Sequence, residues 1–145
     1  MRIIVQRCTE AQVKVDNKIV GKIDKGVMLL VGFTHTDDST NIDYMIDKVL
    51  NLRIFDDENG VMNKSLLDIN GSILSISQFT LYGDARKGRR PSYINALSGD
   101  KATKLYDEFN NKIKEKNIHI ETGIFGADMK VSLTNDGPVT ILLEK

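Results

Sequence analysis

The sequence contains few of the residues that metal sites and thiol chemistry require: one cysteine, Cys8, and two histidines, His35 and His119. A single cysteine cannot form a disulfide within the chain, so the protein needs no oxidising compartment. The two histidines lie far apart in the sequence and make a poor zinc set with one cysteine. Cys8 could be a catalytic nucleophile, but free cysteines are usually buried, so we predict a buried structural thiol.

Long apolar runs and an excess of one charge are also missing. No apolar run approaches the roughly 20 residues that span a bilayer, and the opening segment 1–7 is too short and too charged for a signal peptide. We therefore expect a cytoplasmic protein. The 20 basic and 20 acidic residues give a formal net charge of zero. Proteins that coat a long nucleic acid usually carry a basic excess, so we expect no DNA partner and only a limited grip on any RNA.

The common catalytic motifs are absent as well. The sequence has no nucleophile elbow around a serine, no phosphate-binding loop and no dinucleotide-binding fingerprint. If the chain is an enzyme, it works with hydroxyls, amides, backbone groups or the substrate itself.

The residues that are present predict a single α+β domain over residues 1–145, an ordinary domain length. We expect mixed, mainly antiparallel β-sheets in two layers, barrel-like, with helices on one side. Helices do not separate the strands regularly, which disfavours a doubly wound sheet. The patterns predict helices at about 42–50 and 99–116, and strands at about 1–7, 11–15, 19–21, 27–31, 73–79, 118–121, 129–133 and 139–143.

Local signals predict several boundaries. Asp16-Asn17 and the segment 56–60 are turn signals. The continuous apolar run at 27–31 indicates a strand covered on both faces. Ser39 or Thr40 can cap the first helix, and Asp43 lies where it would complete a capping box with Thr40.

Basic residues crowd into one short segment, with Arg86, Lys87, Arg89 and Arg90 within five positions. The segment is either a solvated loop or an anion site. Gly83 and Gly88 frame it and could let the backbone approach a phosphate.

Two segments combine polar groups with unusual backbone chemistry. The first runs from Ser77 through Gln78, Phe79 and Thr80, where a strand leads into a loop. Its hydroxyl and amide groups could hold a carbonyl or a water, or it could be a strand with ordinary alternation. The second is Asn135-Asp136-Gly137-Pro138-Val139-Thr140, which is either a turn before the last strand or a functional site built on a cis bond before Pro138.

These segments together resemble the D-aminoacyl-tRNA deacylase family, first described for tyrosine. The family pattern Ser-Gln-Phe-Thr-Leu matches residues 77–81, and Asn-x-Gly-Pro-Val-Thr matches residues 135–140. The segments 87–92 and 125–129 and the opening residues to Val13 are also similar to the family, so the resemblance covers the whole chain.

The resemblance implies a homodimer in which a cis Gly137-Pro138 of each subunit enters the active site of the other. The aminoacylated 3′ end of tRNA would lie near catalytic residues Ser77, Gln78, Phe79 and Thr80. Binding residues for substrate or tRNA would be Phe125, Lys87, Arg89, Asn135 and Thr140. The resemblance implies no metal and no organic cofactor.

The implied reaction is hydrolysis of the ester between a D-amino acid and tRNA. An L side chain would clash with the Gly137-Pro138 wall, whereas glycine would pass, so glycyl-tRNA is expected to be a substrate too. Thr80 could be a nucleophile, although an unactivated hydroxyl is weak. Alternatively, backbone amides near Gln78 and Phe79 could stabilise the oxyanion while the ribose 2′-hydroxyl assists or orients water. We favour the second mechanism.

Three other functions remain open on the sequence. A non-catalytic nucleic-acid-binding dimer fits the basic cluster but not the zero net charge. An editing module attached to a tRNA synthetase is disfavoured because the chain has no synthetase core. An unrelated small-molecule esterase is disfavoured because no activated nucleophile is present.

Overall fold

Strand β1 (Arg2–Val15) organises the sheet, because it pairs with three other strands in the computed structural model, which describes residues 1–145. Its first half pairs with β3 (Gly26–Gly32) and its second half with β2 (Lys18–Ile23), both antiparallel. Strand β8 (Lys130–Glu144) pairs antiparallel with β1 along nearly its whole length. The strands predicted at 1–7 and 11–15 are therefore one strand.

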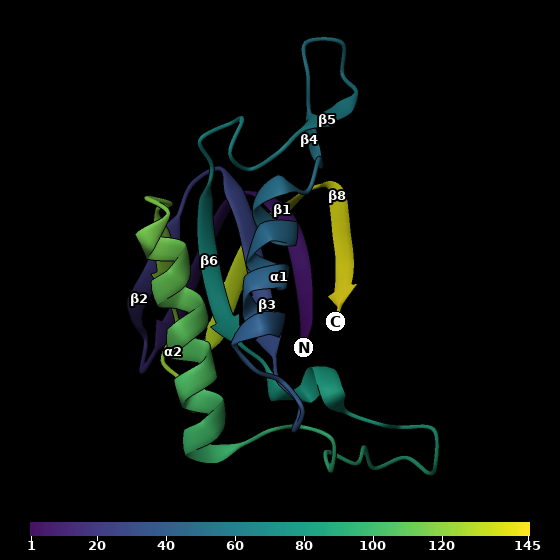
Figure 1. The fold of residues 1–145 in the computed structure, drawn as a ribbon. Coiled ribbons are helices and arrows are strands. Elements are labelled where there is room, and N and C mark those ends of the chain that lie inside the picture. Colours follow the sequence, from purple (N-terminus) through teal and green to yellow (C-terminus); the bar gives the residue numbers. More distant parts are fainter.

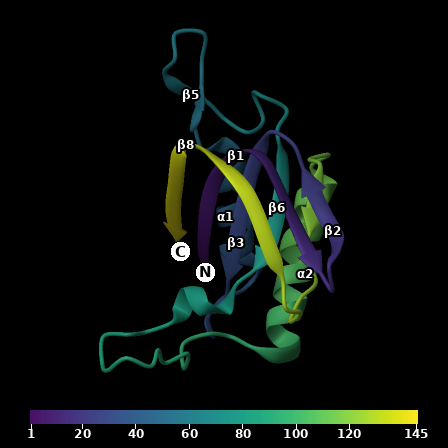
Figure 2. The ribbon, with the colours of Figure 1, turned by 180° about the vertical axis from the view of Figure 1, so that it is seen from behind.

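Two parallel strands complete the main sheet. Strand β6 (Ser72–Ser77) pairs with β3, and β7 (Ile120–Thr122) pairs with β6, so the order is β2-β1-β3-β6-β7 with β8 on β1. Figures 1 and 2 show the sheet curling into a nearly closed, barrel-like shape. A separate hairpin of β4 (Phe55–Asp56) and β5 (Met62–Lys64) projects at the top of Figure 1.

Both helices, α1 (Ser39–Asn51) and α2 (Gly99–Glu115), cover the same side of the sheet (Figure 1). Helix α1, predicted at about 42–50, buries an apolar stripe of Ile42, Met45, Ile46, Val49 and Leu50 in a core of 23 buried residues. The predicted fold class is confirmed: a mixed, mainly antiparallel, barrel-like sheet with helices on one side. Neither helix is long and apolar enough to cross a membrane.

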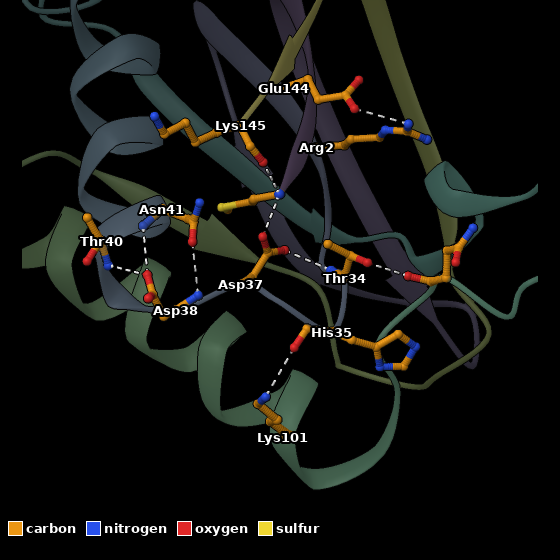
Figure 3. Close-up of polar contacts among 12 residues, drawn as sticks. Arg2, Thr34, His35, Asp37, Asp38, Thr40, Asn41, Lys101, Glu144 and Lys145 are labelled. Atoms are coloured by element: carbon orange, nitrogen blue, oxygen red, sulfur yellow. Dashed lines mark hydrogen bonds and ion pairs between the residues drawn. The ribbon is translucent and has the colours of Figure 1, made fainter.

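The predicted cap of α1 was wrong by one or two residues. Asp38 is the N-cap, and its carboxylate accepts hydrogen bonds from the backbone N–H groups of Thr40 (2.9 Å) and Asn41 (3.2 Å). The Asn41 side chain closes the capping box by accepting from the Asp38 N–H at 3.1 Å (Figure 3). Aspartate caps as well as serine or threonine does, so the helix begins at the earlier residue.

Several strand boundaries also differ from the prediction, among them that of β7, which was predicted at 118–121 and spans Ile120–Thr122. The strand predicted at 73–79 ends at Ser77, and residues Phe79–Tyr82 form the 3-10 helix η1. The strands predicted at 129–133 and 139–143 are the two halves of β8. The segment between them is not a turn between strands, because β1 keeps pairing on both sides of it with a shift of register.

The start and end of the chain lie together beside the loop that follows β3 (Figures 1 and 3). The buried amino group of Met1 donates to Asp37 Oδ1 and to the carbonyl of Lys145, both at 2.6 Å. Asp37 also accepts from the Thr34 N–H at 2.7 Å. These contacts fix the loop that carries Phe33 and Thr34 to the end of the sheet.

Candidate active site

A cavity of about 300 Å³ opens where β3 and β6 end. Ser77, Gln78 and Phe79 line it from the end of β6, and Phe125 lines it from the loop after β7. Ten of its 14 lining residues are hydrophobic, and none carries a titratable side chain. An apolar cavity with a few convergent polar groups is the usual form of a small-molecule site.

The chain leaves the sheet at Gln78 in a way that exposes two backbone donors. The Gln78 N–H donates to the Val31 carbonyl at 2.8 Å, so it is already used inside the sheet. The next two N–H groups, of Phe79 and Thr80, precede the first hydrogen-bonded turn of η1 and donate to no group in the chain. Of the backbone amides near Gln78 and Phe79 that were expected to face an oxyanion, the Gln78 N–H is therefore already paired, and the unpaired neighbours are the N–H groups of Phe79 and Thr80.

The side chains of Gln78 and Thr80 bond each other. The Gln78 amide donates to Thr80 Oγ1, and the Thr80 hydroxyl contacts no carboxylate or imidazole. Thr80 is also exposed. Its hydroxyl thus lacks the neighbouring base that activates a nucleophile.

Phe125 is held by a buried tyrosine. The Tyr106 and Phe125 rings lie 5.8 Å apart, and the Tyr106 hydroxyl donates to the Ser75 carbonyl at 2.8 Å. Burial raises the pKa of Tyr106, so it stays a neutral donor. The wall of the cavity that Phe125 forms is therefore fixed from behind.

The Gly137-Pro138 peptide bond is cis, which confirms that prediction. Both residues are exposed, and Gly137 has a φ of 118° that L side chains rarely adopt. The Asn135 amide donates to Thr140 Oγ1 at 3.0 Å and accepts from the Val139 N–H at 3.2 Å. Asn135 and Thr140 thus close the segment on itself within this chain.

Arg7 anchors this segment, although no motif in the sequence predicts that role. It is 6% exposed, and its guanidinium donates to the Asp136 carbonyl at 3.1 Å and to the Ile54 carbonyl at 2.7 Å. Its charge also faces the carboxylates of Asp56 (3.4 Å) and Asp136 (3.3 Å). An arginine at an inward position of an apolar strand was the only signal available in the sequence.

The Gly137-Pro138 segment and the cavity lie far apart within one chain. The segment faces Arg7 on β1, whereas the cavity lies at the level of Ile3, because Ile3 pairs with Val31 and Val31 with Ser77. Four residues along β1 span roughly 13 Å and three strand spacings roughly 14 Å. Figure 1 shows β8 bending at the top of the sheet and β6 ending at the bottom.

The basic cluster lies on an exposed loop, 84–92, whose base is closed by two backbone hydrogen bonds between Asp84 and Ser92. Arg86 forms an ion pair with Asp84 at 2.6 Å and holds the pKa of that carboxyl at about 2. Lys87, Arg89 and Arg90 form no ion pair. Three of the four positive charges are thus free for an anionic partner.

Cys8 is 1% exposed, and burial raises its pKa to about 11, which confirms the prediction of a buried structural thiol. The thiol stays protonated near neutral pH and cannot serve as a thiolate nucleophile. No group of three or more His, Cys, Asp or Glu side chains is placed to hold a metal ion.

Comparison with known proteins identifies the family. Residues 4–144 match the family model described as D-Tyr-tRNA(Tyr) deacylase. The chain is 58% identical to a D-aminoacyl-tRNA deacylase of Bacillus pumilus (strain SAFR-032), covering 99% of this chain and 98% of that protein. It is 57% identical to the D-aminoacyl-tRNA deacylase of Clostridioides difficile (strain 630), covering 99% and 97%.

Two solved structures are similar over nearly the whole chain. One is described as a c-Myc DNA Unwinding Element Binding Protein, with a TM-score of 0.94 and 38% identity over 100% of this chain and 99% of that one. The other is described as a probable eukaryotic D-amino acid tRNA deacylase, with a TM-score of 0.85 over 98% and 97% of the two chains. At 19% identity, this second likeness shows the fold alone. On the family model and the curated relatives, the chain belongs to the D-Tyr-tRNA(Tyr) deacylase family.

Proposed function

We propose that the protein hydrolyses the ester bond of D-aminoacyl-tRNA and releases a free D-amino acid and tRNA. Its curated relatives carry that activity in their names. The observation that carries the proposal is the cavity at the end of β6, which has two free backbone N–H groups at its rim. These are the parts that acyl-ester hydrolysis needs: a binding pocket and donors for an oxyanion.

The 3′-terminal adenosine of the tRNA occupies the cavity against Phe125 in this proposal. The ester carbonyl then lies near the N–H groups of Phe79 and Thr80, which donate to its oxygen as negative charge develops. Two backbone donors that are already fixed in place cost no reorganisation during the reaction.

Water is the nucleophile in this mechanism, and the ribose 2′-hydroxyl orients it. Two observations support this choice over attack by Thr80. No titratable side chain lines the cavity to act as a general base, and the Thr80 hydroxyl contacts only the Gln78 amide. Thr80 therefore binds or orients the substrate.

Selection of D-aminoacyl groups is assigned to Gly137-Pro138 of the partner subunit. The segment is too far from its own cavity to act there, but it is exposed and anchored by Arg7, as a fixed wall must be. A rigid backbone wall at the α-carbon excludes an L side chain and tolerates many D side chains. Glycine has no side chain, so glycyl-tRNA is a substrate as well.

The activity is tested by incubating D-aminoacyl-tRNA with the protein and measuring the ester that remains. The wild-type protein is expected to shorten the ester lifetime, and Ala127→Phe, which fills the cavity, is expected to abolish that effect. Ala127 lines the cavity and is half-buried, so a larger side chain reaches its interior. Full activity in Ala127→Phe would show that the cavity is not the site.

Action across subunits is tested by mixing two inactive variants. Gly137→Ala damages the segment, because a β-carbon there would lie 2.9 Å from Val139 Cγ2 and 3.0 Å from Arg7 Nη2. Ala127→Phe damages the cavity. Heterodimers of the two variants contain one site with an intact cavity facing an intact segment, so co-expression should restore activity. No restoration would place the segment in its own chain's site.

The β-carbon of Gly137→Ala points at Arg7 and Val139 of the same chain. The variant therefore acts by displacing the wall.

DNA binding is the competing function, since one similar structure is described as a DNA unwinding element binding protein. The zero net charge of this chain disfavours it, because non-specific DNA affinity comes from phosphate neutralisation. Tight, salt-sensitive binding of a DNA duplex with no loss of ester from D-aminoacyl-tRNA would favour the competing function.

A further inference from the structure

Two exposed aromatic rings stand at the mouth of the cavity. The Phe79 side chain is 53% exposed and the Tyr93 side chain 41% exposed, and their rings meet edge to face with centroids 5.1 Å apart. Phe79 also lines the cavity, whereas Tyr93 is not a lining residue and contacts Phe79 from the start of the segment that leads to α2. The two rings thus form an exposed aromatic pair beside the cavity.

Tyr93 is held firmly in this position. The segment that follows it is fastened to the end of β3: Thr34 Oγ1 donates to the Asn95 carbonyl at 2.7 Å (Figure 3), and His35 Nε2 lies 2.8 Å from the Ile94 carbonyl. The ring itself packs against Gly83, where a β-carbon would come within 3.0 Å of Tyr93 Cε1. The Tyr93 ring is therefore exposed but fixed by its neighbours, so a planar group can stack on it.

The basic loop 84–92 lies next to this aromatic pair in the sequence. Loop 84–92 begins next to Gly83 and ends next to Tyr93, and Figure 1 shows it extending away from the body of the protein beyond η1. This loop carries the three cations without ion pairs, Lys87, Arg89 and Arg90. Aromatic rings beside a basic track are the usual features of single-stranded nucleic-acid sites.

We propose that the Phe79 and Tyr93 rings form a stacking subsite for the nucleotide that precedes the terminal adenosine. The proposal rests on the proposed function, because it takes the adenosine to fill the cavity. In this proposal the single-stranded 3′ end leaves the cavity over Phe79. Its next base, the cytosine that precedes the terminal adenosine in tRNA, stacks on Tyr93. The phosphates beyond it lie against loop 84–92. Stacking tolerates any base, so the subsite should bind a base at this position whatever its identity.

The test measures the binding of two unesterified ligands, adenosine 5′-monophosphate and the dinucleotide CpA. The readout is the dissociation constant of the mononucleotide divided by that of CpA. A change in the cavity alters both constants equally and cancels in this ratio. Because one stacked base contributes substantially to affinity, CpA should bind the wild-type protein roughly tenfold more tightly than the mononucleotide. A CpA analogue whose first residue lacks its base should lose that gain.

Tyr93→Leu keeps the apolar contact with Phe79 but has no ring face, so the ratio should fall to near one. Tyr93→Phe should keep it. Tyr44→Leu is the matched control, because Tyr44 on α1 is also 41% exposed and lies away from the cavity. A ratio near one in the wild-type protein, or an unchanged ratio in Tyr93→Leu, would overturn the proposal.

Two further outcomes separate this proposal from its alternatives. If Tyr93→Leu leaves the ratio intact and weakens self-association, the rings belong to a contact between subunits and the proposal is wrong. If the dinucleotide gain is present but D-aminoacyl-tRNA is not hydrolysed, the subsite stands and the proposed function fails. The binding readout makes these failures distinguishable, since it does not depend on an ester.

Discussion

Arg7 holds the Gly137-Pro138 segment to the sheet. A buried guanidinium there joins β1 to the Asp136 carbonyl and to the Ile54 carbonyl. Arg7→Met should lower the free energy of unfolding by about 1–3 kcal/mol, the usual cost of leaving buried partners unpaired, and should reduce D-aminoacyl-tRNA hydrolysis. Urea unfolding followed by circular dichroism measures the first effect and ester lifetime the second.

Arg53→Met is the control for Arg7, because Arg53 is exposed and bonds Asn63 on the β4-β5 hairpin. Its effect on stability should stay within about 0.5 kcal/mol. Equal effects of the two substitutions on hydrolysis would contradict the anchoring role of Arg7.

Thr80 tests the mechanism at a single hydroxyl. Thr80→Val removes the hydroxyl but keeps the shape and the backbone N–H. Both oxyanion donors therefore remain, and deacylation should fall by no more than about tenfold, a smaller loss than removal of one oxyanion donor causes. Loss of an obligatory nucleophile costs on the order of a millionfold. Single-turnover hydrolysis separates these values, and activity at the uncatalysed background with substrate still bound would establish the covalent mechanism.

Individual residues differed in how well the sequence predicted them. The cis bond before Pro138 and the buried thiol of Cys8 were predicted and are confirmed. The role of Arg7 could not be predicted, because its partners Ile54 and Asp136 are distant in the sequence and only the folded sheet brings them together. The free N–H groups of Phe79 and Thr80 likewise depend on where β6 ends, which its composition did not show.

At the scale of elements, loop 84–92 is expected to carry tRNA affinity and not chirality, because contacts to phosphate carry no information about the α-carbon. Changing Lys87 and Arg89 to Gln should weaken tRNA binding and reduce the slope of log K against log salt by roughly 0.7–0.9 for each charge removed. The preference for D over L should be unchanged.

The matched control for this loop replaces Lys114 and Lys116 with Gln. Both are exposed and lie where α2 ends, at the opposite end of the helix from the loop. Titrations of tRNA at several salt concentrations should show no change of slope in this control. A normal slope and a lost D-preference in the loop variant would assign the loop to chirality instead.

Elements with a strong period were predicted well. Helix α1 and the continuous apolar run of β3 appear where the patterns predicted them, because helix and buried-strand patterns are local. The joining of 129–133 and 139–143 into β8 depends on pairing with β1 across the chain, and η1 is too short to leave a period. The cavity itself forms from elements far apart in sequence, so no local pattern predicts it.

At the scale of the whole molecule, the proposed mechanism requires a homodimer, because one chain cannot bring its Gly137-Pro138 segment to its own cavity. A C2 pair supplies two equivalent sites. Sedimentation at micromolar concentration should give a species of twice the 16.3 kDa chain mass. A single species at the chain mass, with full D-aminoacyl-tRNA hydrolysis, would show that the site is complete within one subunit.

The most direct test of the proposed function is the ester lifetime of a matched pair of D- and L-aminoacyl-tRNA, identical in amino acid and tRNA, at one enzyme concentration. The D ester should be hydrolysed far faster than without enzyme, while the L ester should keep its uncatalysed lifetime. Glycyl-tRNA, which offers no side chain to exclude, should be hydrolysed as well. Equal acceleration of the D and L esters, or no acceleration of either, would show that the protein is not a D-selective deacylase.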